Sequence, residues 1–353
     1  MSTLAPGGAP DSDGMWEATL ALPDQIASGA ALAAGTVAAG LPPGDGIGAV
    51  LALGMGGSGI GNDIVSAVAA PLMGIPVLVG KDYELPAWVG SSTLVIAASF
   101  SGNTEETLGA TATALERGAR LVAVTGGGLL AQLAESAGAP VIPLPPGIPH
   151  PRAAIGAMTV APLVVLEALG LLPGAGAMVD AAVTQLRLRR DALVAAGDKS
   201  DAAAIARRIG GTIPLVYGGG GLGRAAALRW KCQVNENPKS PAFASVSPEL
   251  CHNELTGWGQ MGDVTRQLIT LVDLRHDFEH PQVARRFLLV DEIMDEVVSD
   301  VVTIRAAGEG PLAQVFDLVL VGDLVALFLA AQVGIDPGPI PVLEDLKLAL
   351  ARP

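Results

Sequence analysis

Aromatic residues, cysteine and histidine are scarce in this sequence. Of its 353 residues, 3% are aromatic, two are cysteine and four are histidine. Cys232 and Cys251 form neither a disulfide framework nor a metal-ligand spacing, which favours a reducing compartment and predicts a cytoplasmic protein. His252 has no second histidine three or four residues away, and His276 and His280 lack a patterned carboxylate partner. We therefore expect no metal site.

Positive charge is also in short supply. Lysine and arginine number 21 against 35 aspartates and glutamates, which gives a formal net charge of −14. A charge of this sign argues against nucleic acid or an anionic membrane as a partner. An anionic substrate would have to be held locally, by backbone amides and a few placed cations.

The sequence contains no long uninterrupted hydrophobic run. Its most apolar stretch, 315–333, carries Asp317 and Asp323, and two uncompensated carboxylates are rare in a membrane span. We expect a buried core helix there. The first residues, 1–13, are rich in Gly, Pro, Ser and Asp and lack the basic start and apolar centre of a signal peptide. We expect this segment to be disordered.

Small and aliphatic residues dominate instead, with half of the chain hydrophobic and 45 glycines that cluster after apolar stretches. Apolar strand patterns alternate with helical patterns through the first half of the chain. Strands are expected at 49–53, 76–80, 93–98, 120–124 and 140–143, and helices at 62–72, 104–117, 128–137 and 155–169. This alternation predicts an α/β fold with a doubly wound parallel sheet and helices on both faces.

A second α/β pattern follows a helical segment at 177–196. Strands are expected at 213–217, 267–273 and 300–305, and helices at 201–209, 222–234, 281–298 and 313–333. The unit of strand, glycine turn and helix occurs in both halves, which predicts two copies of one domain. We expect a first domain at 14–170, a helical linker at 171–200 and a second domain at 201–353.

Two polar turns follow neighbouring strands of the first predicted sheet. The first turn, 54–61, is rich in glycine and carries Ser58, and we expect its helix to begin near Asn62. Glycine lets the backbone approach a ligand, and the first amides of a helix are unpaired. The second turn holds Ser99, Ser101 and Thr104, and 104–107 resembles a capping box. Both turns should lie at the carboxyl edge of the sheet, where ligands of such sheets bind.

A dinucleotide site is the competing interpretation of the first turn. Gly54, Gly56 and Gly59 match G-x-G-x-x-G between a strand and a helix, and Asp82 follows the next expected strand. The second turn favours a phosphate ester, because four hydroxyls at two adjacent strand ends suit the three acceptor oxygens of a terminal phosphate.

Three further residues have the chemistry of a reaction centre. Arg152 lies between a proline and small residues at a helix start, where it could hold a developing oxyanion. Glu236 ends a helix before Pro238, and the helix dipole makes a carboxylate there a better proton acceptor. His252 lies among polar residues after a loop and suits proton transfer.

Taken together, these segments resemble the bifunctional phosphoglucose/phosphomannose isomerases, built on the sugar isomerase (SIS) fold. The resemblance rests on the following segments in family order: 54–61, 99–107, Pro151-Arg152, Asn235-Glu236-Asn237, His252-Asn253-Glu254 and the C-terminal Asp336-Pro337 with Lys347. Pro238 and Gly338 depart from the usual pattern.

The resemblance implies an enzyme that interconverts glucose 6-phosphate, and also mannose 6-phosphate, with fructose 6-phosphate through a cis-enediolate. The residues that would hold the sugar phosphate are Gly57, Ser58, Ser99, Ser101 and Thr104. Glu236 would move the proton between C1 and C2, Arg152 would stabilise the enediolate, and His252 and Lys347 would open the ring. The resemblance further implies a homodimer in which His252 reaches the partner's site, without cofactor or metal. The alternative is a non-catalytic SIS regulator that binds a sugar phosphate.

Overall fold

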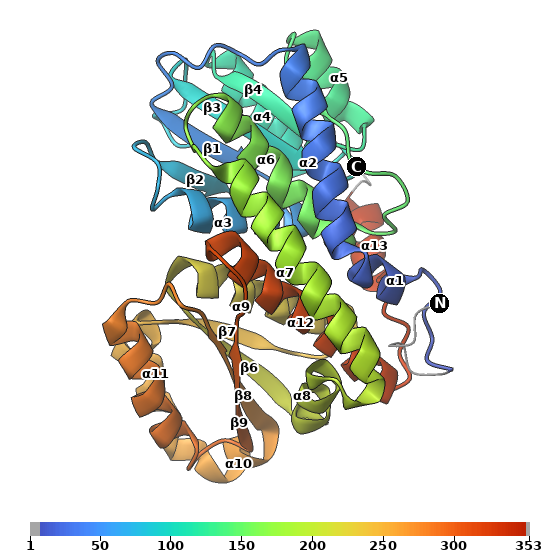
Figure 1. The fold of residues 1–353 in the computed structure, drawn as a ribbon, viewed down its shortest axis with the longest axis vertical. Helices are drawn as coiled ribbons and strands as arrows, with labels where there is room; N and C mark the ends of the chain where they lie inside the picture. Colours follow the sequence, from blue (N-terminus) through green and yellow to red (C-terminus); the bar gives the residue numbers. More distant parts are fainter. Residues whose placement is uncertain (1–7, 351–353) are drawn as a thin grey trace.

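A computed structural model describes residues 8–350, which are arranged around two parallel sheets (Figure 1). The first sheet has the order β2-β1-β3-β4-β5. Its strands are β1 (Ala49–Leu53), β2 (Val77–Gly80), β3 (Thr93–Ser99), β4 (Arg120–Thr125) and β5 (Val141–Ile142). Every residue of β3 is buried, as expected of a central parallel strand covered on both faces. The five strands confirm the predicted doubly wound sheet.

Helices of the first half cover both faces of this sheet. They are α2 (Leu22–Ala39), α3 (Gly56–Ala69), α4 (Glu105–Glu116), α5 (Gly128–Ser136) and α6 (Ile155–Ala168), and the short α1 (Met15–Leu20) precedes them along the chain. The expected start of α3 near Asn62 was wrong, because the helix begins at Gly56 and includes most of the glycine turn. These helical glycines serve close packing, since a β-carbon at Gly61 would lie 3.2 Å from the β-carbon of Met158.

The second sheet has the order β7-β6-β8-β9. Its strands are β6 (Ile213–Gly219), β7 (Phe243–Ser247), β8 (Ile269–Arg275) and β9 (Asp300–Arg305), with helices α8 (Asp201–Ile209), α9 (Gly220–Glu236), α10 (Gly262–Leu268) and α11 (Pro281–Met294) around them. The sequence patterns missed β7, because this edge strand is partly exposed and mixes apolar with serine residues. As in the first half, the central strand runs through a glycine turn into a helix.

Two long helices, α7 (Ala175–Ala196) and α12 (Pro311–Gln332), connect the halves (Figure 1). The stretches Pro151–Ala168 and Pro311–Gln332 are long and apolar enough to cross a membrane, but 78% of the first and 100% of the most apolar 18 residues of the second are buried inside the fold. In α12, Asp317 pairs with Arg189 at 2.7 Å and Asp323 pairs with Arg229 at 2.7 Å. The predicted core helix is therefore confirmed, and its carboxylates are compensated.

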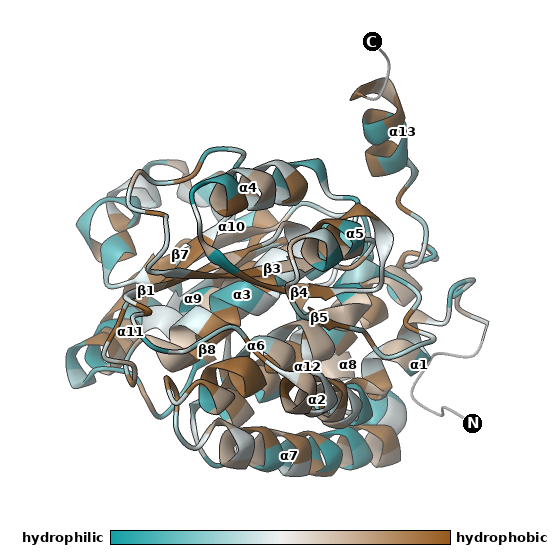
Figure 2. Ribbon diagram, turned by 90° about the horizontal axis from the view of Figure 1, so that it is seen from above, coloured by the Kyte–Doolittle hydropathy of each residue, from teal (hydrophilic) through white to brown (hydrophobic). Residues whose placement is uncertain are grey.

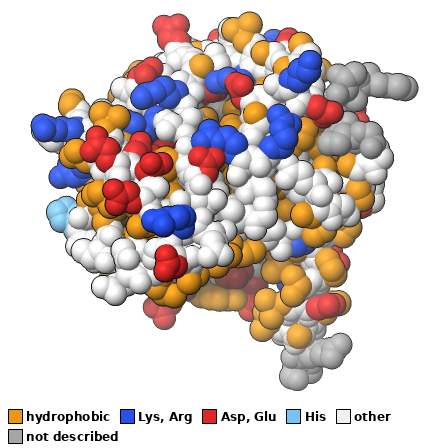
Figure 3. Space-filling view, turned by 90° about the horizontal axis from the view of Figure 1, so that it is seen from below, with side chains coloured by type: hydrophobic (Ala, Val, Ile, Leu, Met, Phe, Trp, Pro, Cys, Tyr) orange, Lys and Arg blue, Asp and Glu red, His pale blue; other side chains and the backbone are white. Residues whose placement is uncertain are grey.

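The final helix, α13 (Pro341–Leu350), stands off the body of the molecule (Figure 2). It contains no buried residue, and five of its large apolar side chains are exposed. Figure 3 shows these hydrophobic side chains on the projecting arm. An isolated helix of this length is marginal in water, so α13 needs a packing partner.

The N-terminal residues that the structure describes are held in place. The backbone amide of Met15 donates to the Asp11 carboxylate at 2.7 Å, and the amide of Ser12 donates to Asp336 at 3.1 Å. The expectation of disorder was thus wrong for residues 8–13, while residues 1–7 lie outside the described part. The domain limits 14–170, 171–200 and 201–353 remain a proposal.

Candidate active site

The two polar turns leave the same edge of the first sheet. Leu53, at the end of β1, is paired with Ala97 of β3. The two parallel strands therefore end at the same edge, and each is followed by a turn and a helix. A β-carbon at Gly54 would lie 2.9 Å from the carbonyl oxygen of Ala98 and 3.2 Å from the β-carbon of Ser58. Only glycine allows this approach, which brings Ser58 and the β3 turn together.

Hydroxyl groups organise the second turn. The hydroxyls of Ser99 and Thr104 lie 2.8 Å apart, and the amide of Gly102 donates to Ser99 at 3.1 Å. Ser99 is buried, whereas Ser101 is exposed. The expected capping box was wrong, because Thr104 precedes α4 without a side-chain bond to its amides. Its hydroxyl instead faces Ser99, and position 107 is threonine rather than the glutamate that such a box requires.

Arg152 is brought to the first turn by a short 3-10 helix, η1 (Pro151–Ala154). A β-carbon at Gly57 would lie 2.8 Å from the Pro151 carbonyl oxygen and 3.1 Å from the Arg152 α-carbon. The start of α3, which carries Ser58, therefore packs directly on the backbone of Arg152. This contact places the first polar turn next to Arg152.

The Arg152 guanidinium is almost completely buried and fixed by several acceptors. Its Nε donates to Asn237 Oδ1 at 3.1 Å, and its Nη2 donates to the carbonyls of Pro337 and Gly338 at 2.6 and 2.7 Å. Burial lowers the pKa of Arg152, and the Glu236 carboxylate opposes that shift. An arginine in such surroundings keeps its charge, so the site holds a desolvated, oriented cation.

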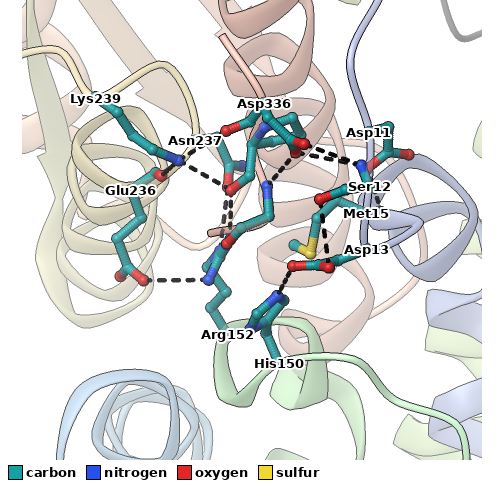
Figure 4. Close-up of polar contacts among 12 residues, drawn as sticks. Asp11, Ser12, Asp13, Met15, His150, Arg152, Glu236, Asn237, Lys239 and Asp336 are labelled. Carbon is teal, nitrogen blue, oxygen red and sulfur yellow. Dashed lines mark hydrogen bonds and ion pairs between the residues drawn. The ribbon is translucent and has the colours of Figure 1, made fainter. Parts of the chain in front are cut away.

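Glu236 lies where sequence reasoning placed it, as the last residue of α9. Its Oε2 lies 3.8 Å from Nη1 of Arg152, and its side chain remains 27% exposed. The carboxylate is therefore partly open to solvent, while the guanidinium beside it is buried and oriented. Figure 4 shows the two side chains facing one another.

A second pair of charges, Arg229 and Asp323, holds the backbone of Arg152. Arg229 of α9 makes a bidentate contact with Asp323 of α12, at 2.9 and 2.7 Å. The same guanidinium donates to the backbone carbonyl of Arg152 at 2.7 Å. Sequence reasoning missed Arg229, because no local pattern separates it from a surface arginine.

The N-terminal segment covers the other side of Arg152 (Figure 4). Asp13 Oδ2 lies 2.7 Å from Nε2 of His150, the residue that precedes η1. A β-carbon at Gly338 would lie 2.4 Å from Asp13 Oδ2. Gly338, which departs from the usual family pattern, therefore has a local reason, since Asp13 occupies the space that a side chain would need.

The two expected ring-opening residues do not join this cluster within one chain. His252 is exposed in the 3-10 helix η3 (Glu249–His252), and Lys347 lies on the exposed α13. In the part of the chain that the structure describes, neither side chain makes a hydrogen bond or ion pair to Arg152 or Glu236. Among residues 8–350, no three histidine, cysteine, aspartate or glutamate side chains are grouped to hold a metal ion.

Comparisons with known proteins identify relatives of this chain. The family profile described as bacterial phospho-glucose isomerase C-terminal SIS domain matches residues 198–350. The bifunctional phosphoglucose/phosphomannose isomerase of Caldicellulosiruptor bescii is 38% identical over 306 residues, which cover 86% of this chain and 89% of the relative. The enzyme of the same description from Aquifex aeolicus is 33% identical over 300 residues, covering 85% and 89%.

Among solved structures, the hypothetical protein TT0462 from Thermus thermophilus shares the fold. Its TM-score is 0.73 at 17% identity, over 96% of this chain and 90% of that one. The relatives at 38% and 33% identity extend over most of both chains. The chain therefore belongs to the bifunctional phosphoglucose/phosphomannose isomerase family.

Proposed function

We propose that this protein interconverts glucose 6-phosphate and mannose 6-phosphate with fructose 6-phosphate, as a cytoplasmic enzyme. The proposal is carried by one observation, the 3.8 Å approach of the Glu236 carboxylate to the Arg152 guanidinium. A proton next to a carbonyl is removed only when a base and an oxyanion partner act on the same substrate. The family relationship supports the choice of substrate.

The phosphate of the substrate would lie over the start of α3 and the β3 turn. Gly57 and Ser58 lie at the first amides of α3, which favour an anion. Ser99, Ser101 and Thr104 add hydroxyl donors from the neighbouring turn. This end of the site would bind every substrate in the same way, since all three share the ester at C6.

The chemistry would take place at the other end of the sugar. Glu236 removes the C2 proton of the open-chain aldose, and the electron pair moves through C1 to O1. Arg152 stabilises the negative charge of the resulting cis-enediolate. Glu236 then delivers the proton to C1, while a proton moves from O2 to O1, which leaves the ketose. No atom or electron is gained or lost overall, so the step needs no external oxidant or reductant.

Ring opening needs a further acid, which we assign to His252 and Lys347 in a homodimer. An acid must protonate the ring oxygen while the O1 proton is removed. His252 is exposed and α13 carries Lys347 away from the body, which supports completion of each site by a second copy.

Turnover of each aldose phosphate, followed by proton NMR in deuterated water, tests the reaction. We expect wild-type protein to form fructose 6-phosphate with exchange at C2. Glu236→Gln should lose both turnover and exchange while it still binds the phosphate ester. Binding without exchange by wild-type protein would instead identify a non-catalytic regulator.

Subunit complementation tests the trans role of His252. Glu236→Gln and His252→Ala are each expected to be inactive as homodimers. After unfolding and refolding together, mixed dimers should regain activity, because one of their two sites then receives an intact glutamate and an intact histidine. An inactive mixture that contains mixed dimers would place His252 in its own chain's site.

A further inference from the structure

Lys239 makes an unusual set of contacts three residues after Glu236. Its backbone has φ of 57°, the only positive value among the non-glycine residues that the structure describes. Its Nζ donates to the carbonyl oxygens of Glu236, Asp336 and Pro337, at 2.7, 3.0 and 3.1 Å. An ammonium group has three protons, and all three are used on backbone acceptors.

These three carbonyls belong to the two segments that meet at the reaction centre (Figure 4). The Glu236 carbonyl ends α9, whose last side chain is the carboxylate base of the proposed reaction. The segment 336–338 supplies the carbonyls of Pro337 and Gly338 that orient Arg152. Lys239 and Arg152 thus share one acceptor, the carbonyl oxygen of Pro337.

Charge alone does not explain why this ammonium lies here. Lys239 makes no ion pair with a carboxylate among residues 8–350, although Asp336 and Glu236 are nearby in sequence or space. Desolvation and the neighbouring Arg152 charge lower the pKa of Lys239. The backbone also adopts a left-handed conformation that side chains other than glycine rarely take. These unfavourable features are offset by the three hydrogen bonds.

We propose that Lys239 is a positioning residue that fixes the Glu236 carboxylate relative to the Arg152 guanidinium. It does so by tying the end of α9 to the segment that orients Arg152. The inference rests on the proposed isomerase function, in which both groups must contact one substrate. A shift of about 1 Å between such groups can lower a rate about a hundredfold.

Substitution by glycine separates this role from a contribution to folding. Glycine adopts a φ of 57° without strain. Lys239→Gly therefore removes the three hydrogen-bond donors and also removes the backbone strain at this position. We expect kcat to fall at least about tenfold, KM for the hexose phosphate to change less than about threefold and the melting temperature to stay near that of wild type. KM should be insensitive because the phosphate-binding turns are untouched.

Lys231→Met is the matched control, because Lys231 lies on α9 and makes no hydrogen bond or ion pair within residues 8–350. It removes the same charge and should leave kcat unchanged. The alkaline side of the kcat profile gives a second readout. Wild-type kcat should begin to fall below the ordinary lysine pKa of 10.5, because the lowered pKa removes a donor there. Lys239→Gly should lack this limb.

Each outcome has a distinct meaning. Inactive wild-type protein would reject the proposed function itself. Active wild-type protein with equal kcat in Lys239→Gly would overturn the positioning role. A parallel loss of kcat and melting temperature in Lys239→Gly would also overturn it, because the lysine would then act through stability.

Discussion

Single glycines set the distances between the parts of the site. Gly57 touches the backbone of η1, and Gly54 touches the end of β3. Any side chain at these positions would push the polar turns away from Arg152. Glycine at these positions allows close packing and also leaves the backbone amides accessible. Its low helix propensity lowers the stability of the helix in return.

Gly57→Ala should therefore separate α3 from η1. Because the added carbon meets backbone atoms at 2.8 and 3.1 Å, we expect a loss of about 1–3 kcal/mol in the free energy of unfolding. The kcat/KM for hexose phosphates should fall at least about tenfold, since Arg152 moves with η1. Gly109→Ala in α4 is the control, because nothing lies within 4 Å of its β-carbon. Equal behaviour of the two variants would contradict the packing role.

Asp273 of β8 predicts a pH dependence of stability. Burial, together with the neighbouring Asp291, raises the pKa of Asp273 to about 9. Its unfolded pKa is about 3.9, so the folded protein holds a proton that the unfolded chain releases. Stability is then greatest below the unfolded pKa and declines as pH rises towards the folded pKa, by at most about 1.4 kcal/mol per pH unit.

Thermal unfolding between pH 6 and pH 9 measures this effect. We expect the melting temperature of wild type to fall with rising pH more steeply than that of Asp273→Asn. Asparagine has no proton to lose and nearly the same shape. Parallel curves for the two proteins would show that Asp273 does not cause the decline.

At the scale of elements, α9 connects the packing of the molecule to its chemistry. Its middle carries Arg229, which pairs with Asp323 of α12 and holds the Arg152 carbonyl. Its end carries Glu236. The helix is fixed at α12 by close packing, since a β-carbon at Gly322 would lie 2.2 Å from Nε1 of Trp230. A buried ion pair is thus built into the support of the site.

Breaking that pair and replacing it should have different results. Asp323→Leu alone leaves a buried, uncompensated guanidinium, which costs about 3–5 kcal/mol. The double variant Arg229→Met with Asp323→Leu should regain most of the stability, because apolar replacements of buried pairs are often neutral. Its kcat should stay low, since the Arg152 carbonyl has lost its donor. Urea unfolding and kinetics on the same samples check this, and a recovered kcat would contradict a link between the pair and Arg152.

At the scale of the whole molecule, α13 projects from the body and contains no buried residue. Val342, Leu343, Leu346 and Leu350 fall within about 100° around the helix, which makes one apolar stripe, and Lys347 lies about 40° from its edge. Packing of this stripe on a second copy would place Lys347 at the border of the contact. This arrangement supports the proposed homodimer.

Leu346→Asp should weaken that dimer, because it places a carboxylate in the apolar stripe. We expect the mass in solution, measured by light scattering, to shift towards the monomer and kcat to fall with it. Leu348→Asp is the matched control, since Leu348 is also exposed but lies about 160° away from Leu346 around the helix. Dissociation by both variants, or by neither, would contradict packing through the stripe.

The sequence by itself determined the succession of strands and helices from 49 to 169 and the position of the two polar turns. Alternating strands and helices force parallel strands, and parallel strands bring their carboxyl ends to one edge. Glu236 and Arg152 could be found from their local surroundings, a helix end before proline and a helix start after proline. Short-range steric and electrostatic rules are sufficient for features of this kind.

Only the tertiary structure decided which distant groups meet. Lys239, Arg229 and Asp13 act through backbone carbonyls or through space vacated by glycine, and such contacts have no sequence pattern. The need for glycine at position 57 depends on η1, which lies far along the chain and whose backbone a β-carbon there would meet. Among residues 8–350 of one chain, nothing holds His252 or Lys347 at Glu236, so their proposed part in ring opening requires the proposed second copy.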